Sequence, residues 1–241
     1  MRPSLVALIL AILLAPSANA QSEAPAALFR RGNESAARSL WDNAIVEYSR
    51  LAKEGVRAPS LYWNWAQAAS AAGRKGEALW ALMRARELSP TDAGMIREVE
   101  RHRSELGLDP SEISLGFLGD LRMLGRRFRC DIFAIAAFLF SSIIVATPSR
   151  KRTALSLGSF VLGLLLAAPF FLGSWSEPRA VVAQKDAPLL DAPRADAVAL
   201  ANLREGEVVP LLGQEGDYVK IQDASGARGF AHRNDVRPLG D

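Results

Sequence analysis

The sequence predicts a multi-domain fold that combines an all-α repeat domain, a two-helix transmembrane hairpin and a small all-β barrel. Three observations predict it. A region rich in Ala, Leu, Arg and Glu repeats with a period of about 34 residues. Two long apolar runs follow, and each approaches the roughly 20 residues that cross a bilayer. In the final part of the chain, apolar and polar residues alternate in short runs separated by glycines, a pattern that is typical of short strands.

The composition excludes several classes of function. Lys and Arg number 29 against 26 Asp and Glu, a near balance that argues against nucleic acid as a partner. One cysteine and two histidines exclude a disulfide framework and a Cys/His zinc site within one chain. The sequence holds no glycine-rich phosphate loop or nucleophile motif, and His102, between two arginines, is expected to be solvated. We therefore predict a non-enzymatic protein with no catalytic, cofactor or metal site.

The first segment, 1–20, has the three parts of a secretory signal peptide. Arg2 precedes the apolar run Leu5–Leu14, Pro16 breaks that run, and Ala18-Asn19-Ala20 fits the small-x-small cleavage pattern. The alternative is an N-terminal anchor that is not cleaved. In either case the following segment is expected to be exported, which in a Gram-negative cell means to the periplasm.

The segment 24–108 is expected to be helical and repetitive. Residues of matching size or character recur 34 positions apart: Leu28 and Tyr62, Gly32 and Ala66, Ala44 and Ala78, and Tyr48 and Leu82. Small residues suit the places where two helices cross closely, and large ones fill the space around them. This pattern resembles the tetratricopeptide repeat family, with repeats at about 25–58 and 59–92 and a capping helix at 92–106. A generic pair of helical hairpins is the alternative.

The resemblance implies a groove that binds a partner. Tetratricopeptide proteins that hold a C-terminal carboxylate use two asparagines and several basic residues. Asn33 and Asn64 occupy the matching places here, but Phe29, Gly94 and Glu98 stand where basic residues are required. We therefore predict an aromatic and amide-lined surface for a peptide or helix, made by Phe29, Asn33, Trp63, Asn64 and Gln67. The alternative is that these side chains belong to the core.

The segment 109–129 reads as an amphipathic helix at a membrane surface, or else as a linker helix docked on the repeats. The two apolar runs after it, 130–147 and 153–175, predict transmembrane helices joined by a short basic loop at 148–152. Such a hairpin places the chain before it and after it on one side, with the basic loop cytoplasmic. Four arginines within 122–129 favour the opposite orientation, and the export signal decides against it.

Small residues recur every four positions in the second apolar run, at Ser159, Gly163 and Ala167. A stripe of this kind permits close helix approach and predicts transmembrane packing. The partner is either the first run, through Ala137 and Ser141, or another protein. Ordinary composition of an apolar helix is the alternative.

The C-terminal segment 179–239 reads as a small barrel of short strands. Strands are expected at Ala180–Ala183, Val208–Leu212, Tyr218–Ile221 and Gly229–Ala231, with glycine-containing turns between them. The order of glycines and apolar residues resembles bacterial SH3-like domains, in which tryptophans usually lie near the positions of Tyr218 and Phe230. The resemblance implies a surface at these two residues that binds peptides or cell-wall material.

The order of the parts resembles the BatE-like proteins of the aerotolerance operon. That resemblance implies a scaffold in the bacterial inner membrane with both soluble domains in the periplasm. It would contact the lipid bilayer and protein partners, namely von Willebrand factor A-domain proteins and a MoxR-type ATPase, in stress tolerance. The alternative function is a cell-wall anchor whose SH3-like domain holds peptidoglycan.

Overall fold

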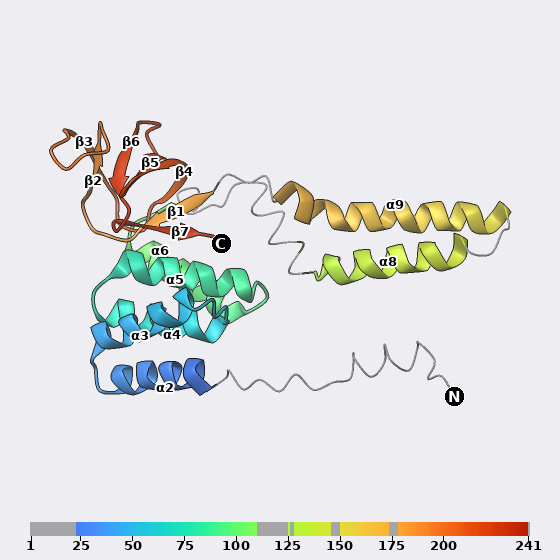
Figure 1. Ribbon diagram of the computed structural model, residues 1–241, viewed down its shortest axis with the longest axis horizontal. Coiled ribbons are helices and arrows are strands. Elements are labelled where there is room, and N and C mark those ends of the chain that lie inside the picture. The colour runs from blue at the N-terminus through green and yellow to red at the C-terminus, as the bar shows by residue number, and fades with distance from the viewer. Residues whose placement is uncertain (1–22, 110–124, 126–127, 146–149, 174–177, 241) are drawn as a thin grey trace, which may run out of the picture.

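The computed structural model describes residues 23–109, 125, 128–145, 150–173 and 178–240. The predicted signal peptide 1–20 and most of the predicted juxtamembrane segment 109–129 lie outside these residues. The described residues form seven helices and one antiparallel sheet of seven strands (Figure 1). The helices are α2 (Glu23–Ala37), α3 (Trp41–Lys53), α4 (Pro59–Ala71), α5 (Lys75–Leu88), α6 (Ala93–Glu105), α8 (Cys130–Val145) and α9 (Arg150–Gly173). The strands are β1 (Arg179–Val182), β2 (Ala187–Leu190), β3 (Ala199–Leu203), β4 (Val208–Glu215), β5 (Tyr218–Gln222), β6 (Arg228–His232) and β7 (Val236–Leu239).

Helices α2 to α6 pack in sequence order, each against the next, around one apolar core. Glycines with positive φ end α3 and α4, at Gly55 (86°) and Gly73 (77°), because glycine adopts the left-handed conformation without the steric cost of a Cβ atom. Pro59 occupies the first turn of α4, where its missing N–H costs no hydrogen bond. Asp92 caps α6 by accepting from the backbone N–H groups of Gly94 and Met95.

Small residues set the spacing of these helices. Ala44, Ala66 and Ala78 are fully buried. A Cβ on Gly32 would lie 2.5 Å from Cε1 of Tyr48, so α2 and α3 approach closely only because this residue has no side chain. The core between the helices is filled by large side chains, among them Trp65, Tyr48, Tyr62, Leu61, Leu79 and Leu82.

Helix α5 is buried on every side. All ten residues from Gly76 to Ala85 are buried, including the charged Glu77 and Arg84. Helices α4 and α6 cover part of α5, and strands β1 and β7 of the sheet cover another part (Figure 1). The sheet is therefore packed directly on the helical segment, through a helix whose sequence carries no simple amphipathic pattern.

Polar contacts join α5 to the strands and to the turn between β3 and β4. The indole N–H of Trp80 donates to the carbonyl oxygen of Pro238 at 2.8 Å. The backbone N–H of Gly76, in the first turn of α5, donates to the carboxylate of Glu205, in the turn between β3 and β4, at 2.7 Å. This side chain supplies the helix cap that α5 itself lacks. Arg237 donates to the buried carboxylate of Glu77 at 2.8 Å.

The sheet has the strand order β3-β2-β6-β5-β4-β1-β7, with β3 and β7 at its edges. Its core comes from alternate residues, such as Val219 and Ile221 on β5 and Ala231 on β6. The register shifts between Leu211 and Gly213, where β4 passes from pairing with β1 to pairing with β5. The predicted barrel is therefore wrong, because these strands form a single sheet with two edges.

Helices α8 and α9 pack against each other and lie to one side of the rest (Figure 1). In the described part of the chain, no helix combines the length and apolar character that a bilayer span needs. The predicted basic loop is wrong in part, because its residues from Arg150 on begin α9.

This finding overturns three predictions. The transmembrane hairpin in the predicted fold class is wrong, and so is the inner-membrane localisation. The placement of the C-terminal segment on the same side of the membrane as the helical segment depended on this hairpin and is overturned with it.

Candidate protein-binding face

Alternate helices present one continuous surface, which we call the amide face. It is the exposed side of α2, α4 and α6 and is made by Phe29, Asn33, Trp63, Asn64, Gln67, Glu98 and Arg101. On α4, residues 60, 63, 64, 67 and 71 share this side because they are three or four positions apart. The five residues that the sequence analysis singled out for a groove all lie on this face.

Asn33 and Asn64 meet at the centre of the amide face. Oδ1 of Asn33 accepts from Nδ2 of Asn64 at 2.9 Å and from the Tyr48 hydroxyl at 2.8 Å. Burial raises the pKa of Tyr48, against the opposing effect of its hydrogen bond with Asn64, so the phenol stays protonated as a donor. Each amide is thereby held in one orientation.

The fixed amides leave one donor and one acceptor for a ligand. Within the described residues, no protein partner is found for Nδ2 of Asn33 or Oδ1 of Asn64. An amide N–H beside a carbonyl oxygen complements the C=O and N–H of a peptide backbone. The pair can therefore bind a main chain without reading its side chains.

Aromatic rings flank the amides. The Phe29 ring lies 6.1 Å from the Tyr48 ring, centroid to centroid, and is half-buried. Trp63 is also half-buried, and both rings pack on the helical core. Each ring packs on the core on one side and is partly exposed on the other, so the binding surface stays a prediction. A rigid, partly exposed ring is a favourable anchor for a partner.

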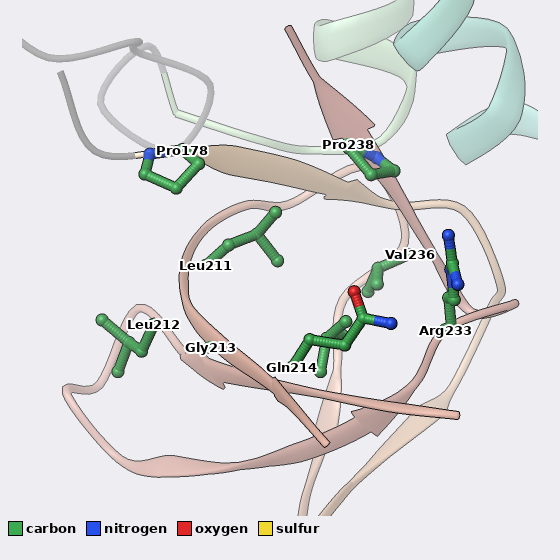
Figure 2. A pocket seen from close by; sticks show the side chains of 9 residues that line it. Pro178, Leu211, Leu212, Gly213, Gln214, Arg233, Val236 and Pro238 are labelled. Carbon is green, nitrogen blue, oxygen red and sulfur yellow. The ribbon is translucent and has the colours of Figure 1, made fainter. Parts of the chain in front are cut away.

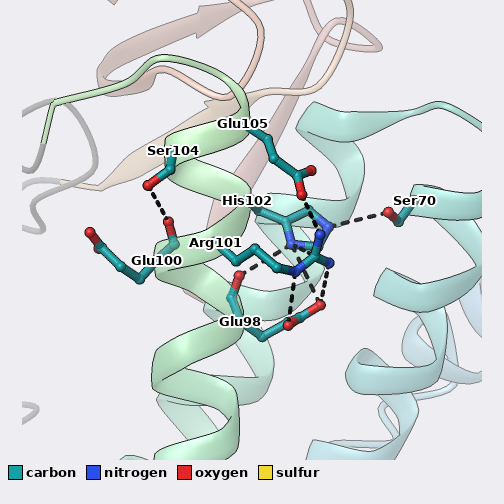
Figure 3. Close-up of polar contacts among 7 residues, drawn as sticks. All are labelled: Ser70, Glu98, Glu100, Arg101, His102, Ser104 and Glu105. Atoms are coloured by element: carbon teal, nitrogen blue, oxygen red, sulfur yellow. Dashed lines mark hydrogen bonds and ion pairs between the residues drawn. The ribbon is translucent and has the colours of Figure 1, made fainter.

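The third helix of the face carries a charged pair (Figure 3). Gln67 is exposed and hydrogen-bonds Glu98, which links α4 to α6. Arg101 donates through Nε to Glu98 at 3.1 Å and also pairs with Glu105. Its hydrogen bonds are the main reason why the pKa of Glu98 is lowered, so this carboxylate stays ionised and neutralised. The face therefore holds no excess of basic charge at this end.

His102 is buried, which corrects the prediction that it is solvated. Its side chain is 1% exposed, and Nε2 lies 3.3 Å from the Ser70 hydroxyl of α4 (Figure 3). Nδ1 lies 3.2 Å from the carbonyl oxygen of Glu98. The flanking arginines misled the sequence reasoning, because adjacent residues of a helix point about 100° apart. His102 therefore fixes α6 to α4 from below the amide face.

The sheet residues singled out from the sequence lie on its outer face. Tyr218 stands opposite His232, with ring centroids 5.5 Å apart and nearly perpendicular. Phe230 stands opposite Lys220, whose Nζ lies 5.8 Å from the ring centroid. Both aromatics are half-buried and are engaged by a cross-strand neighbour.

The predicted small-residue stripe faces the neighbouring helix of the same chain. A Cβ on Gly163 would lie 2.9 Å from the Phe138 ring of α8, and Ala167 is buried. Ser159 instead bonds within α9, to the carbonyl oxygen of Ser156. Ser141 of α8 bonds Ser156, one turn before the stripe. The stripe thus serves contact between α8 and α9, in helices that do not form the predicted transmembrane pair.

Sequence reasoning missed Arg101 and His102 as parts of the α4–α6 junction. The signal was present, because Gly94, Glu98, Arg101 and Glu105 share one helix side by their spacing. No family model matches the chain, and no curated protein matches it. The resemblances to tetratricopeptide, SH3-like and BatE-like proteins therefore stay predictions.

Proposed function

We propose that the protein is a non-enzymatic scaffold that holds an extended segment of a protein partner on the amide face. The observation that carries the proposal is the contact between Asn33 and Asn64. It brings together two separate helical pairs and leaves an oriented donor and acceptor between half-buried aromatic rings. An extended segment fits because its backbone groups are free to bond, whereas those of a helix are already paired.

The charge on the face selects the kind of segment. Glu98 is neutralised by Arg101, and Arg30 pairs with Glu34 along α2 at 3.8 Å. A near-neutral surface with aromatic anchors favours a partner segment with aliphatic side chains over an acidic tail or a C-terminal carboxylate. By the resemblance to BatE-like proteins, we propose von Willebrand factor A-domain proteins and a MoxR-type ATPase as the partners, in stress tolerance.

The test is selection of peptides from a displayed random library on the immobilised full chain. We expect enriched peptides with aliphatic residues, and Asn64→Ala to weaken their binding at least tenfold because it removes the acceptor and frees the Asn33 amide. Asn43→Ala is the matched control, since Asn43 is an exposed asparagine of α3 outside the amide face. Binding is measured by fluorescence anisotropy of a labelled selected peptide.

The proposal fails if no peptide is enriched, or if the two asparagine variants lower binding equally. A circular dichroism melt of each variant shows whether the fold is retained. Phe29→Leu, which keeps an apolar side chain on the core, gives a second readout: it should weaken binding without a large change in melting temperature.

The alternative of a cell-wall anchor has weaker support. Tyr218 and Phe230 are each engaged by a neighbour on the sheet, His232 and Lys220. These neighbours cover part of each ring, and no fixed polar group beside the rings is described that corresponds to the Asn33–Asn64 pair of the amide face.

A further inference from the structure

A pocket of about 350 Å³ opens in the sheet (Figure 2), and none of its lining residues belongs to the amide face. Its apolar wall comes from Leu211 on β4, Val219 on β5 and Val236 on β7. The volume is at the small end of the range for ligand sites, which is about 300–1,000 Å³. It therefore suits one side chain or a small molecule.

The pocket follows from the irregularity of β4. The register shifts between Leu211 and Gly213, and before this point the Leu211 N–H is bonded to the Pro178 carbonyl oxygen at 2.7 Å. β4 therefore turns from β1 towards β5 at the pocket, so that the Leu211 side chain lies in its wall. The opening is thus built into the strand pairing.

One charged side chain lines this pocket, Arg233 in the turn between β6 and β7. It is exposed, and the described residues show no ion pair for its guanidinium. No carboxylate lines the pocket. An unneutralised guanidinium beside an apolar wall complements a ligand that joins an apolar group to a carboxylate.

The geometry points to this pocket as a binding site for the C-terminal apolar residue of a peptide. The side chain of that residue lies against Leu211, over a floor formed by the buried Val219 and Val236, and its α-carboxylate pairs with Arg233. Gln214 lies on the rim, and its Nε2 is held by the Gly216 carbonyl oxygen at 3.3 Å. Its Oε1 is thereby left to accept the peptide N–H next to the carboxylate. This site is independent of the amide face.

The pocket is connected to the helical segment through β7. Pro238 lines the pocket, and its carbonyl oxygen accepts the indole N–H of Trp80 on α5. Contact of a ligand with Pro238 is therefore expected to alter the surroundings of Trp80. Intrinsic tryptophan emission gives a readout of occupancy that needs no label.

The experiment is calorimetric titration of the full chain with acetyl-Ala-Ala-Leu bearing a free carboxylate, its C-terminal amide, and 4-methylpentanoate. We expect the free peptide acid to bind, the amide to bind at least tenfold more weakly, and the simple acid to bind more weakly than the peptide. Arg233→Gln should reduce peptide binding at least tenfold. Arg228→Gln, at an exposed arginine of β6 outside the pocket, should leave it unchanged.

Several results would overturn the assignment. They are equal binding of acid and amide, equal effects of the two arginine variants, equal binding of 4-methylpentanoate, or no binding at millimolar peptide. Gln214→Ala is a second variant, at an exposed position. It should weaken binding of the peptide but not binding of 4-methylpentanoate. Asn64→Ala, which tests the amide face, should leave this titration unchanged, so the two proposals fail separately.

Discussion

Asp235 shows how one buried group makes stability depend on pH. It precedes β7, and burial raises the pKa of its carboxyl from the ordinary 3.8, with partial opposition from His232. A raised folded-state pKa means that the folded protein binds this proton more readily than the unfolded chain does. Burial of the ionised Asp235 carboxylate therefore lowers the free energy of unfolding. This loss is absent below pH about 3.8 and grows as the pH rises through the folded-state pKa.

The residue-scale prediction concerns Asp235→Asn, which removes the charge and keeps the shape. We expect a higher melting temperature than that of the unchanged chain at pH 7, with the difference shrinking as the pH falls towards 4. Thermal melts from pH 4 to pH 8 measure it. Asp217→Asn is the control, because Asp217 is exposed in the turn between β4 and β5. A constant difference across this pH range would contradict the argument.

Other residues show where sequence reasoning ends. The amides of Asn33 and Asn64 were singled out by position, but their direct contact joins residues 31 apart and depends on how two helical pairs stack. The burial of His102 and Glu77 likewise depends on partners from other elements. The pocket at Arg233 was missed, because its lining comes from separate strands.

At the scale of elements, strands with strong local patterns were predicted and weak ones were not. The predicted strands at Val208–Leu212, Tyr218–Ile221 and Gly229–Ala231 fall within β4, β5 and β6. Strands β2 and β7 each contain a proline, and β3 is rich in alanine. Such sequences have low strand propensity, so their pairing depends on contacts with the neighbouring strands rather than on local preference.

The element-scale prediction concerns the turn between β3 and β4, which packs on the helices. Gly206 has φ of 83°, and a Cβ there would lie 2.6 Å from Leu106 Cδ1. Gly206→Ala should therefore lose about 2–3 kcal/mol of unfolding free energy, from backbone strain and overpacking together. Gly216 has φ of 60°, but a Cβ there would meet no atom within 4 Å. Gly216→Ala should therefore lose only about 1–2 kcal/mol of unfolding free energy. Urea denaturation compares them, and equal losses would refute the packing contribution.

For the whole molecule, the main feature is the contact between the helices and the sheet at Glu77. This carboxylate is 4% exposed and is bonded by Trp65 at 3.1 Å and by Arg237 at 2.8 Å. The Arg237 guanidinium also lies 5.7 Å and 5.5 Å from the ring centroids of Trp65 and Trp80. Because the arginine belongs to β7 and its partners to α4 and α5, helices and sheet should unfold together.

The whole-molecule prediction is that Arg237→Ala lowers the unfolding free energy by about 2–4 kcal/mol, since it leaves a buried carboxylate with fewer partners. We also expect scanning calorimetry to resolve two transitions where the unchanged chain has one. Arg194→Ala should change little, because its pair with Asp196 is exposed. A single unshifted transition in Arg237→Ala would show that the contact does not couple the two parts.

The sequence by itself determined the local elements, because apolar periodicity, glycine turns and proline positions act between near neighbours. It placed helices before sheet and put the five predicted groove residues on suitable helix positions. It failed for α8 and α9: their apolar composition suggested bilayer spans, but among the described residues no helix combines the length and apolar character that a span needs. Only the tertiary structure decided the buried Glu77, the oriented amides and the Arg233 pocket. Each of these requires side chains that are distant in sequence to meet. A local sequence pattern does not say which distant residues come together.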